Sequence, residues 1–206
     1  GKWCTLPVMI SYRVRRLHAA GETARRYHLF DRADHLPLVA DQGSAWLPPD
    51  QPPHVRFARP DGERVASMDL PRPTDRRPEK QHNYAVIYEH AVYALITAPA
   101  RPPGGATGPL TSSSGIVWPF TRLMIEVEGH RWLGLRWREE AGPLLVLYDA
   151  AGLSLAVERD SSDLREPLGL LEVGAGDYDF DLTLPAGRLE QGALVGLALV
   201  FLIDNS

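Results

Sequence analysis

Nine basic residues are the part of this sequence best suited to binding chemistry. Arg13 and Arg15 alternate within a segment that favours a strand, so their side chains are expected to share one face. A guanidinium group presents N–H donors in a planar fork that matches the oxygens of a phosphate. The pattern therefore predicts binding of a phosphate or an anionic lipid headgroup. The candidate ligand-binding residues are Arg13, Arg15, Arg16, Arg25, Arg26, Arg72, Arg76, Arg77 and Lys80.

The same charges have a simpler interpretation, in which they are solvated and pair with acidic residues elsewhere in the chain. Residues 1–80 carry a net charge of +4 and residues 81–206 a net charge of −8, which together give −4. Such asymmetry can mark a surface for an anionic partner, while the negative total argues against general nucleic-acid binding. Both interpretations of the arginines stay open, and no nucleic-acid partner is expected.

Metal-binding patterns are weak in this sequence. The seven histidines are scattered, and none forms a His-x-x-x-His pair or lies beside a cysteine. Asp177, Asp179 and Asp181 alternate on one face of a predicted strand, where carboxylates repel each other unless they are solvated or hold a cation. The glycine and the final glutamate of an EF-hand loop are missing. We therefore expect a solvated outer face and no metal.

Catalytic motifs are also missing. The glycine-rich segment 104–108 is not followed by Lys-Ser or Lys-Thr, so it does not match a phosphate-binding loop. The serines at 112–114 lack the glycine frame of a nucleophile elbow. Cys4 is the sole cysteine, which excludes an intramolecular disulfide and favours a reducing compartment. We expect no enzymatic activity and no cofactor.

The element that organises the chain is an apolar segment at its end. From Gly192 to Ile203 every residue is apolar or glycine, without the polar stripe of a helix that faces solvent. The segment is shorter than the ~20 residues that a membrane-spanning helix needs. It is therefore predicted to be a helix at about 186–203, entered through Pro185 and surrounded by protein.

Short strands account for most of the remaining chain. Segments 11–17, 26–30, 54–58, 63–69, 121–128, 131–137, 144–148, 153–157, 168–173 and 178–184 carry strand patterns. Residues 36–40 read as a further strand that Pro37 places at an edge or a strand start. Residues 83–96 fit one long strand or two strands bent at Glu89-His90, and Pro60-Asp-Gly62 predicts a hairpin turn.

These elements predict a mainly β (α+β) fold in one domain over residues 1–206. About twelve short strands with one fully apolar helix favour a closed antiparallel β-barrel, because closure removes exposed sheet edges. The buried C-terminal helix would then occupy its centre. Long loops are expected at about 70–82 and 99–115, where proline, glycine and serine accumulate without periodicity.

The end of the chain resembles a known superfamily. Asp177–Pro185, followed by the apolar run Ala193–Asp204, is similar to the strand, link, buried helix and terminal aspartate of phospholipid scramblases and LURP-one-related proteins. Both belong to the tubby-like superfamily. The resemblance implies a β-barrel threaded by a hydrophobic C-terminal helix, and a binding or membrane-associated module rather than an enzyme. Tubby domains bind phosphoinositides through basic surface residues.

Three functions stay open on the sequence. The leading hypothesis is a non-enzymatic tubby-like or LURP-one-like binding or scaffolding module that recognises phosphoinositide or other anionic lipid headgroups. The alternatives are a small-molecule-binding protein or enzyme with a site at a barrel mouth, and a protein–protein interaction domain. We expect a cytoplasmic protein that associates peripherally with membranes and has no transmembrane span.

Overall fold

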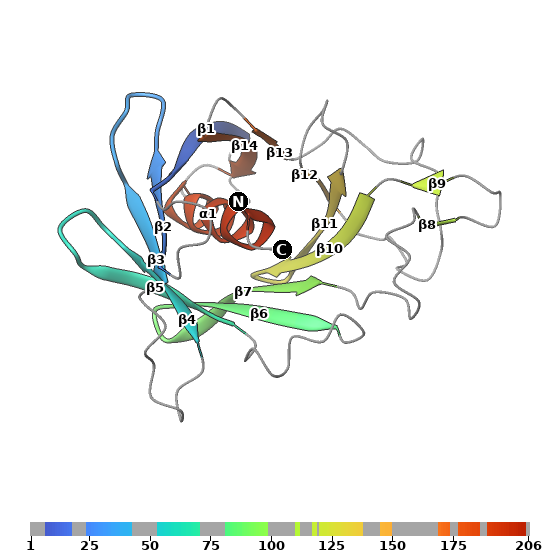
Figure 1. Ribbon diagram of the computed structural model, residues 1–206, viewed down its shortest axis with the longest axis horizontal. Helices are drawn as coiled ribbons and strands as arrows, with labels where there is room; N and C mark the ends of the chain where they lie inside the picture. Colours follow the sequence, from blue (N-terminus) through green and yellow to red (C-terminus); the bar gives the residue numbers. More distant parts are fainter. Residues whose placement is uncertain are drawn as a thin grey trace, which may run out of the picture.

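A computed structural model describes most of the predicted elements of the chain (Figure 1). It covers residues 7–17, 24–42, 53–70, 81–98, 110–111, 117–118, 120–137, 145–149, 169–173, 177–185 and 189–204. The fold is mainly β with one C-terminal helix among the described residues, as the sequence predicts.

The strands follow one another through most of the chain before the helix begins. In order they are β1 (Pro7–Arg16), β2 (Arg25–Phe30), β3 (Leu38–Gln42), β4 (His54–Ala58), β5 (Arg64–Asp69), β6 (His82–Tyr88), β7 (Ala91–Ala98), β8 (Leu110–Thr111), β9 (Val117–Trp118), β10 (Phe120–Val127), β11 (His130–Trp137), β12 (Leu145–Asp149), β13 (Gly169–Val173) and β14 (Asp177–Pro185). The helix α1 spans Leu189–Asp204.

Twelve of the described strands form one antiparallel sheet. Their order is β1-β14-β13-β12-β11-β10-β7-β6-β5-β4-β3-β2, and β2 pairs again with β1, so the topology is that of a closed barrel. The contact between β1 and β14 joins the two ends of the chain, with Tyr12 opposite Phe180 and Arg15 opposite Asp177. The remaining pair, β8 and β9, forms a separate small ribbon.

Side chains alternate between the inside and the outside of this sheet. In β2, Tyr27 and Leu29 are fully buried, while Arg26 is exposed and His28 and Phe30 are partly exposed. In β1, Tyr12 and Val14 are buried in the same way. This period-two pattern separates an apolar inner face from an outer face that can carry charge.

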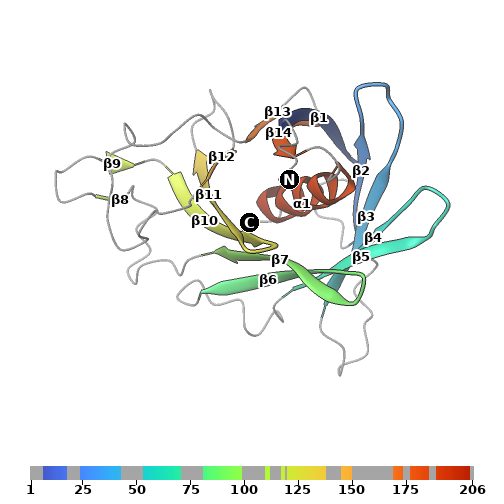
Figure 2. The same cartoon turned by 180° about the vertical axis from the view of Figure 1, so that it is seen from behind.

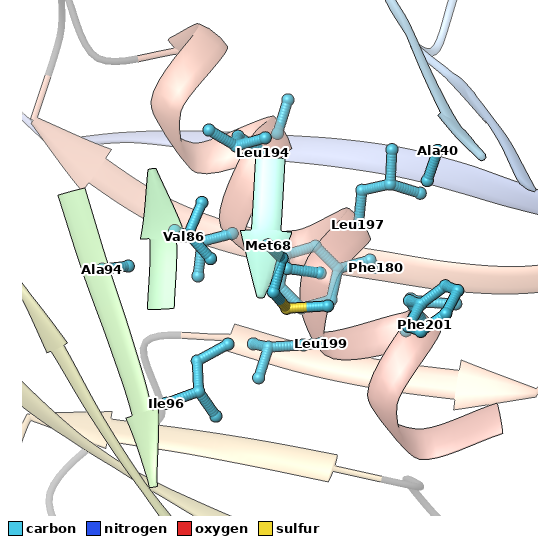
Figure 3. Close-up of a cluster of buried hydrophobic side chains, with 14 of the residues drawn as sticks. Ala40, Met68, Val86, Ala94, Ile96, Phe180, Leu194, Leu197, Leu199 and Phe201 are labelled. Carbon is cyan, nitrogen blue, oxygen red and sulfur yellow. The ribbon is translucent and has the colours of Figure 1, made fainter. Parts of the chain in front are cut away.

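Helix α1 lies in the middle of the ring of strands in both views (Figures 1 and 2). Every side chain in Ala193–Phe201 is buried, which explains why the segment has no polar stripe. Leu197 and Leu199 are completely inaccessible to solvent. Figure 3 shows them among apolar side chains from several strands, including Met68 of β5 and Ile96 of β7.

The helix fits closely against the strand that precedes it. Gly196 faces Phe180 of β14, and a β-carbon at position 196 would lie 2.5 Å from the aromatic ring. A side chain at this position would therefore require Phe180 to move. On another side of the helix, the rings of Phe201 and Tyr27 meet edge to face with their centroids 5.6 Å apart. Backbone proximity and aromatic packing thus fix the helix within the sheet.

Several predicted turns are confirmed. In the loop at Pro60-Asp-Gly62, Gly62 has a φ of +89° and its N–H donates to the Arg59 carbonyl oxygen at 2.9 Å. The stretch 83–96 forms two strands, β6 and β7, joined at Glu89-His90. The connection between the strands predicted at 121–128 and 131–137 lies one residue earlier than those bounds imply, because Glu128 and Gly129 occupy the positive-φ positions and His130 begins β11.

Other boundaries differ from the prediction. Pro185 does not lead into the helix; it is the last residue of β14, opposite Pro7, and α1 begins at Leu189. Pro37 does not make β3 an edge strand, because β3 starts after it and pairs with both β2 and β4. The predicted loop at 99–115 includes strand β8. The strand predicted at 153–157, residues 71–80 and the rest of the 99–115 loop lie outside the described residues.

Within the described part of the chain, no helix is long and apolar enough to cross a membrane.

Candidate functional site

The outer face of β1 carries two of the predicted ligand-binding arginines side by side. Arg13 and Arg15 are two residues apart on the strand, and their side chains are 40% and 49% exposed. Across the barrel seam, their register partners on β14 are Asp179 and Asp177. The seam therefore places a basic strand beside an acidic one on the outer surface.

A single carboxylate lies between these two arginines. Oδ1 of Asp177 is 3.4 Å from Nε of Arg15, and Oδ2 is 4.0 Å from Nε of Arg13. The Asp177 side chain is 21% exposed, so the group is in contact with solvent. Both distances are at the long end for an ion pair, and exposed pairs of this kind contribute little to stability. We name Arg13, Arg15 and Asp177 the seam triad.

Arg13 has a second acidic neighbour in the loop between β2 and β3. One Nη of Arg13 donates a hydrogen bond to Asp34, which has a φ of +59°. The loop is held by Asp31, whose carboxylate accepts hydrogen bonds at 2.9 Å from the backbone N–H groups of Ala33 and His35. Asp31 is thus a side-chain cap that positions Asp34 against β1.

Phe30 and His28 complete the outer surface next to Arg15. The Arg15 guanidinium carbon lies 5.3 Å from the centroid of the Phe30 ring, a cation–π arrangement that supports the side chain. The pKa of His28 is below its ordinary value because of partial burial and the positive charges of Arg26 and Arg15. Partial burial is the larger cause, and the two arginines add to it.

The arginines of β2 occupy two different positions. Arg26 lies on the outer face and its Nη2 is 3.1 Å from Oδ2 of Asp41 on β3, which is also 3.9 Å from Nη2 of Arg56. Arg25 is partly buried. By strand alternation it shares the inner face with Tyr27. The structure thus does not gather Arg25 and Arg26 into one cluster.

Arg16 belongs to a separate polar cluster at the end of helix α1. Its Nη1 donates to Oδ1 of Asp204 at 3.1 Å, and the Asp204 side chain is only 6% exposed. The hydroxyl of Tyr178 donates to the same oxygen, and that of Tyr27 donates to the other. Each carboxylate oxygen therefore has a donor. The cluster ties the helix to β1, β2 and β14 and does not form part of the arginine surface.

The three alternating aspartates of β14 lie on the outer face, as their spacing predicts. Asp181 accepts a hydrogen bond from Ser11, Asp177 lies between the arginines, and Asp179 is exposed. No group of three or more potential metal ligands occurs among the described residues. Of the three carboxylates, Asp177 is the one with arginine counter-charges on β1.

Two geometric features of the described arginines are seen in the structure. Arg13 and Arg15 share an exposed face, while Arg13, Arg15, Arg16 and Arg26 each pair with an aspartate. The sequence analysis missed the partners of these arginines and the contributions of Phe30 and His28. Arg72, Arg76, Arg77 and Lys80 lie outside the described residues.

Comparison with known proteins identifies no relative of this chain. No protein-family model matches the chain, and no significant match was found among curated proteins or solved structures.

Proposed function

We propose that this protein is a non-enzymatic binding module of the tubby-like type that recognises phosphate-bearing anionic groups. The surface of lipid membranes, through phosphoinositide or other anionic headgroups, is the proposed source of these groups. Arg13 and Arg15 are the residues that would contact the ligand. The observation that carries the proposal is that these two exposed guanidinium groups lie side by side and share one carboxylate.

The filled interior of the barrel supports a site on its outer surface. The apolar helix occupies the space that a ligand takes in other closed barrels, and its side chains from Ala193 to Phe201 are buried. The polar groups at the end of the helix are already engaged, since Asp204 accepts hydrogen bonds from Arg16, Tyr27 and Tyr178. The exposed arginines of β1 are therefore better candidates for contacts with a partner.

The surroundings of Arg15 add to this support. Stacking on Phe30 restricts the guanidinium and leaves its edge for hydrogen bonding. Arg15, together with Arg26, contributes to the lowered pKa of His28, after the larger effect of partial burial. The resemblance of the last strand and helix to scramblases and LURP-one-related proteins agrees with a membrane-directed role. The proposed location is the cytoplasmic face of a membrane.

Vesicle flotation tests the proposal. The protein should float with phosphatidylcholine vesicles that contain a phosphatidylinositol phosphate, and should stay at the bottom with pure phosphatidylcholine. Binding should weaken with increasing salt, because the contacts are electrostatic and exposed. The Arg13→Gln/Arg15→Gln variant should lose most of this binding. Equal flotation with both vesicle types, or no flotation with either, would contradict the proposal.

A further inference from the structure

In the seam triad, the Asp177 carboxylate does not form good hydrogen bonds with the Nε donors of Arg13 and Arg15. Asp177 is close enough to both Nε atoms for electrostatic attraction, but at 3.4 and 4.0 Å it makes at most one weak hydrogen bond. Nε of Arg13 is shielded from solvent and has no hydrogen-bond partner. A charged donor without an acceptor is energetically unfavourable. Nε of Arg13 can therefore still donate to a hydrogen-bonding partner, such as an anion.

A phosphate group would satisfy these donors better than the carboxylate does. It has more acceptor oxygens and carries up to two negative charges near neutral pH. Bidentate contacts between guanidinium groups and phosphate are shorter and stronger than the contacts that Asp177 makes. Because Asp177 already lies between the two Nε atoms, a phosphate can reach both of them only after this side chain has moved away.

We infer that Asp177 is an internal competitor for the anion site formed by Arg13 and Arg15. In the free protein its carboxylate occupies the position between the two guanidinium groups, and an incoming phosphate displaces it. The competitor lowers the affinity for weak anions and makes the site selective for groups with more charge and more oxygens. This inference rests on the proposed function, because it concerns the same arginines.

The sequence offers a matched control for this contact. Asp179 lies on the same strand and the same outer face, two residues from Asp177, and is opposite Arg13 in the strand register. Its side chain is exposed, whereas the Asp177 carboxylate lies against both arginines. Asp177→Asn and Asp179→Asn therefore change the net charge equally, while only the first removes a carboxylate from between the arginines.

The experiment measures the affinity of wild type, Asp177→Asn and Asp179→Asn in two arms. One arm titrates inorganic phosphate and follows the Nε–Hε resonances of Arg13 and Arg15 by NMR. The other measures cosedimentation with phosphatidylcholine vesicles that contain a phosphatidylinositol phosphate. Asp177→Asn should bind both phosphate and vesicles about two- to fivefold more tightly than wild type. This range corresponds to the free energy of an exposed ion pair, which the anion no longer has to break. Asp179→Asn should stay close to wild type.

Each outcome is informative. A higher affinity of Asp177→Asn for inorganic phosphate alone identifies free phosphate as the ligand. A higher affinity for the vesicles alone identifies a lipid headgroup. Either result supports Asp177 as a competitor for the anion site. An unchanged affinity for Asp177→Asn, or an equal gain for Asp179→Asn, overturns the inference. If the inference about Asp177 fails in this way but Arg13→Gln/Arg15→Gln still abolishes binding, the proposed function at the two arginines stands. Absence of binding by wild type and Asp177→Asn alike overturns both. Asp177→Ser provides a second variant with the same expected gain if Asp177→Asn folds poorly.

Discussion

The guanidinium group of Arg16 donates a hydrogen bond to the carboxylate of Asp204 at 3.1 Å, across 188 residues of sequence. The contact joins the end of the first strand to the end of the last helix. A carboxylate at a helix C-terminus faces the negative end of the helix dipole, so it needs nearby positive charge and hydrogen-bond donors. Arg16 provides the charge, while Tyr27 and Tyr178 provide hydroxyl donors.

Removing the Asp204 charge should destabilise the protein. Asp204→Asn loses the ion pair with Arg16 and directs an amide N–H₂ at one of its present donors. We expect the free energy of unfolding to fall by about 1.5–3 kcal/mol, the range for hydrogen bonds to charged groups. Urea denaturation measures the change. Asp69→Asn, at an exposed aspartate, should change it by less than about 0.5 kcal/mol. Equal effects of the two substitutions would show that Asp204 has no special role.

The central position of α1 can be tested with a charge in its apolar surface. Leu199 is completely buried, so Leu199→Asp places an uncompensated carboxylate inside the barrel. We expect loss of the cooperative unfolding transition in circular dichroism. Val92→Asp is the control, because Val92 is 64% exposed on β7 and the substitution should leave folding intact. A folded, monomeric Leu199→Asp protein is incompatible with the buried helix.

The turn between β6 and β7 contains local strain that substitution can relieve. Glu89 and His90 have φ values of +47° and +65°, which side-chain-bearing residues adopt at a cost. Asn-Gly is the preferred pair in such two-residue hairpin turns. Glu89→Asn/His90→Gly should raise the free energy of unfolding by about 1 kcal/mol in urea denaturation.

The two-residue turn between β10 and β11 allows the opposite test, because it already has a glycine at its second position. Gly129 occupies the second turn position with a φ of +81°, and beyond its two chain neighbours no atom lies within 4 Å of the place where its β-carbon would be. Gly129→Ala should therefore destabilise through backbone strain alone, by about 1 kcal/mol. Stabilisation by Gly129→Ala, or no gain from the Asn-Gly pair in the β6–β7 turn, would show that backbone conformation does not limit stability at these hairpins.

Protonation of His28 should couple stability to pH. Its folded-state pKa is below the ordinary value of 6.5, because partial burial and the charges of Arg26 and Arg15 disfavour the imidazolium. The unfolded chain thus binds a proton more readily than the folded protein, and stability rises with pH in this window. The contribution is fully present above about pH 6.5 and decreases as the pH falls towards the folded-state pKa.

NMR titration of the His28 ring and urea unfolding at several pH values check this coupling together. The ring should titrate below the pH expected for an exposed histidine, and His28→Gln should reduce the loss of stability on acidification. A His28 pKa above the ordinary value of 6.5 would contradict the burial and the nearby positive charges given for this side chain.

Local sequence patterns predict much of the fold and one part of the site. The apolar run at 192–203 indicates a surrounded helix because no polar position interrupts it, and alternation in β1 places Arg13 and Arg15 on one face. Pro60-Asp-Gly62 specifies its turn because local backbone chemistry is sufficient there. These features depend on residues close together in the chain.

The partners of the arginines could not be predicted in the same way. Asp177 meets Arg15 across 162 residues, through a register between β1 and β14 that the whole barrel sets. Arg16, next to Arg15 in sequence, instead reaches the end of α1, because adjacent strand residues point to opposite faces. Pro185 illustrates the same limit: the pairing with β1 extends β14 through a residue that local rules place at the helix entry.

Binding of anionic vesicles by two charge-matched variants tests the central claim most directly. Arg13→Gln/Arg15→Gln and Arg64→Gln/Arg131→Gln each remove two positive charges, the second pair from exposed positions on β5 and β11. Cosedimentation with vesicles that contain a phosphatidylinositol phosphate should show at least about tenfold weaker binding for the first variant, because each basic residue near an anionic surface contributes ~1 kcal/mol. The second variant should bind like wild type. Equal losses in both variants would contradict a specific site at Arg13 and Arg15.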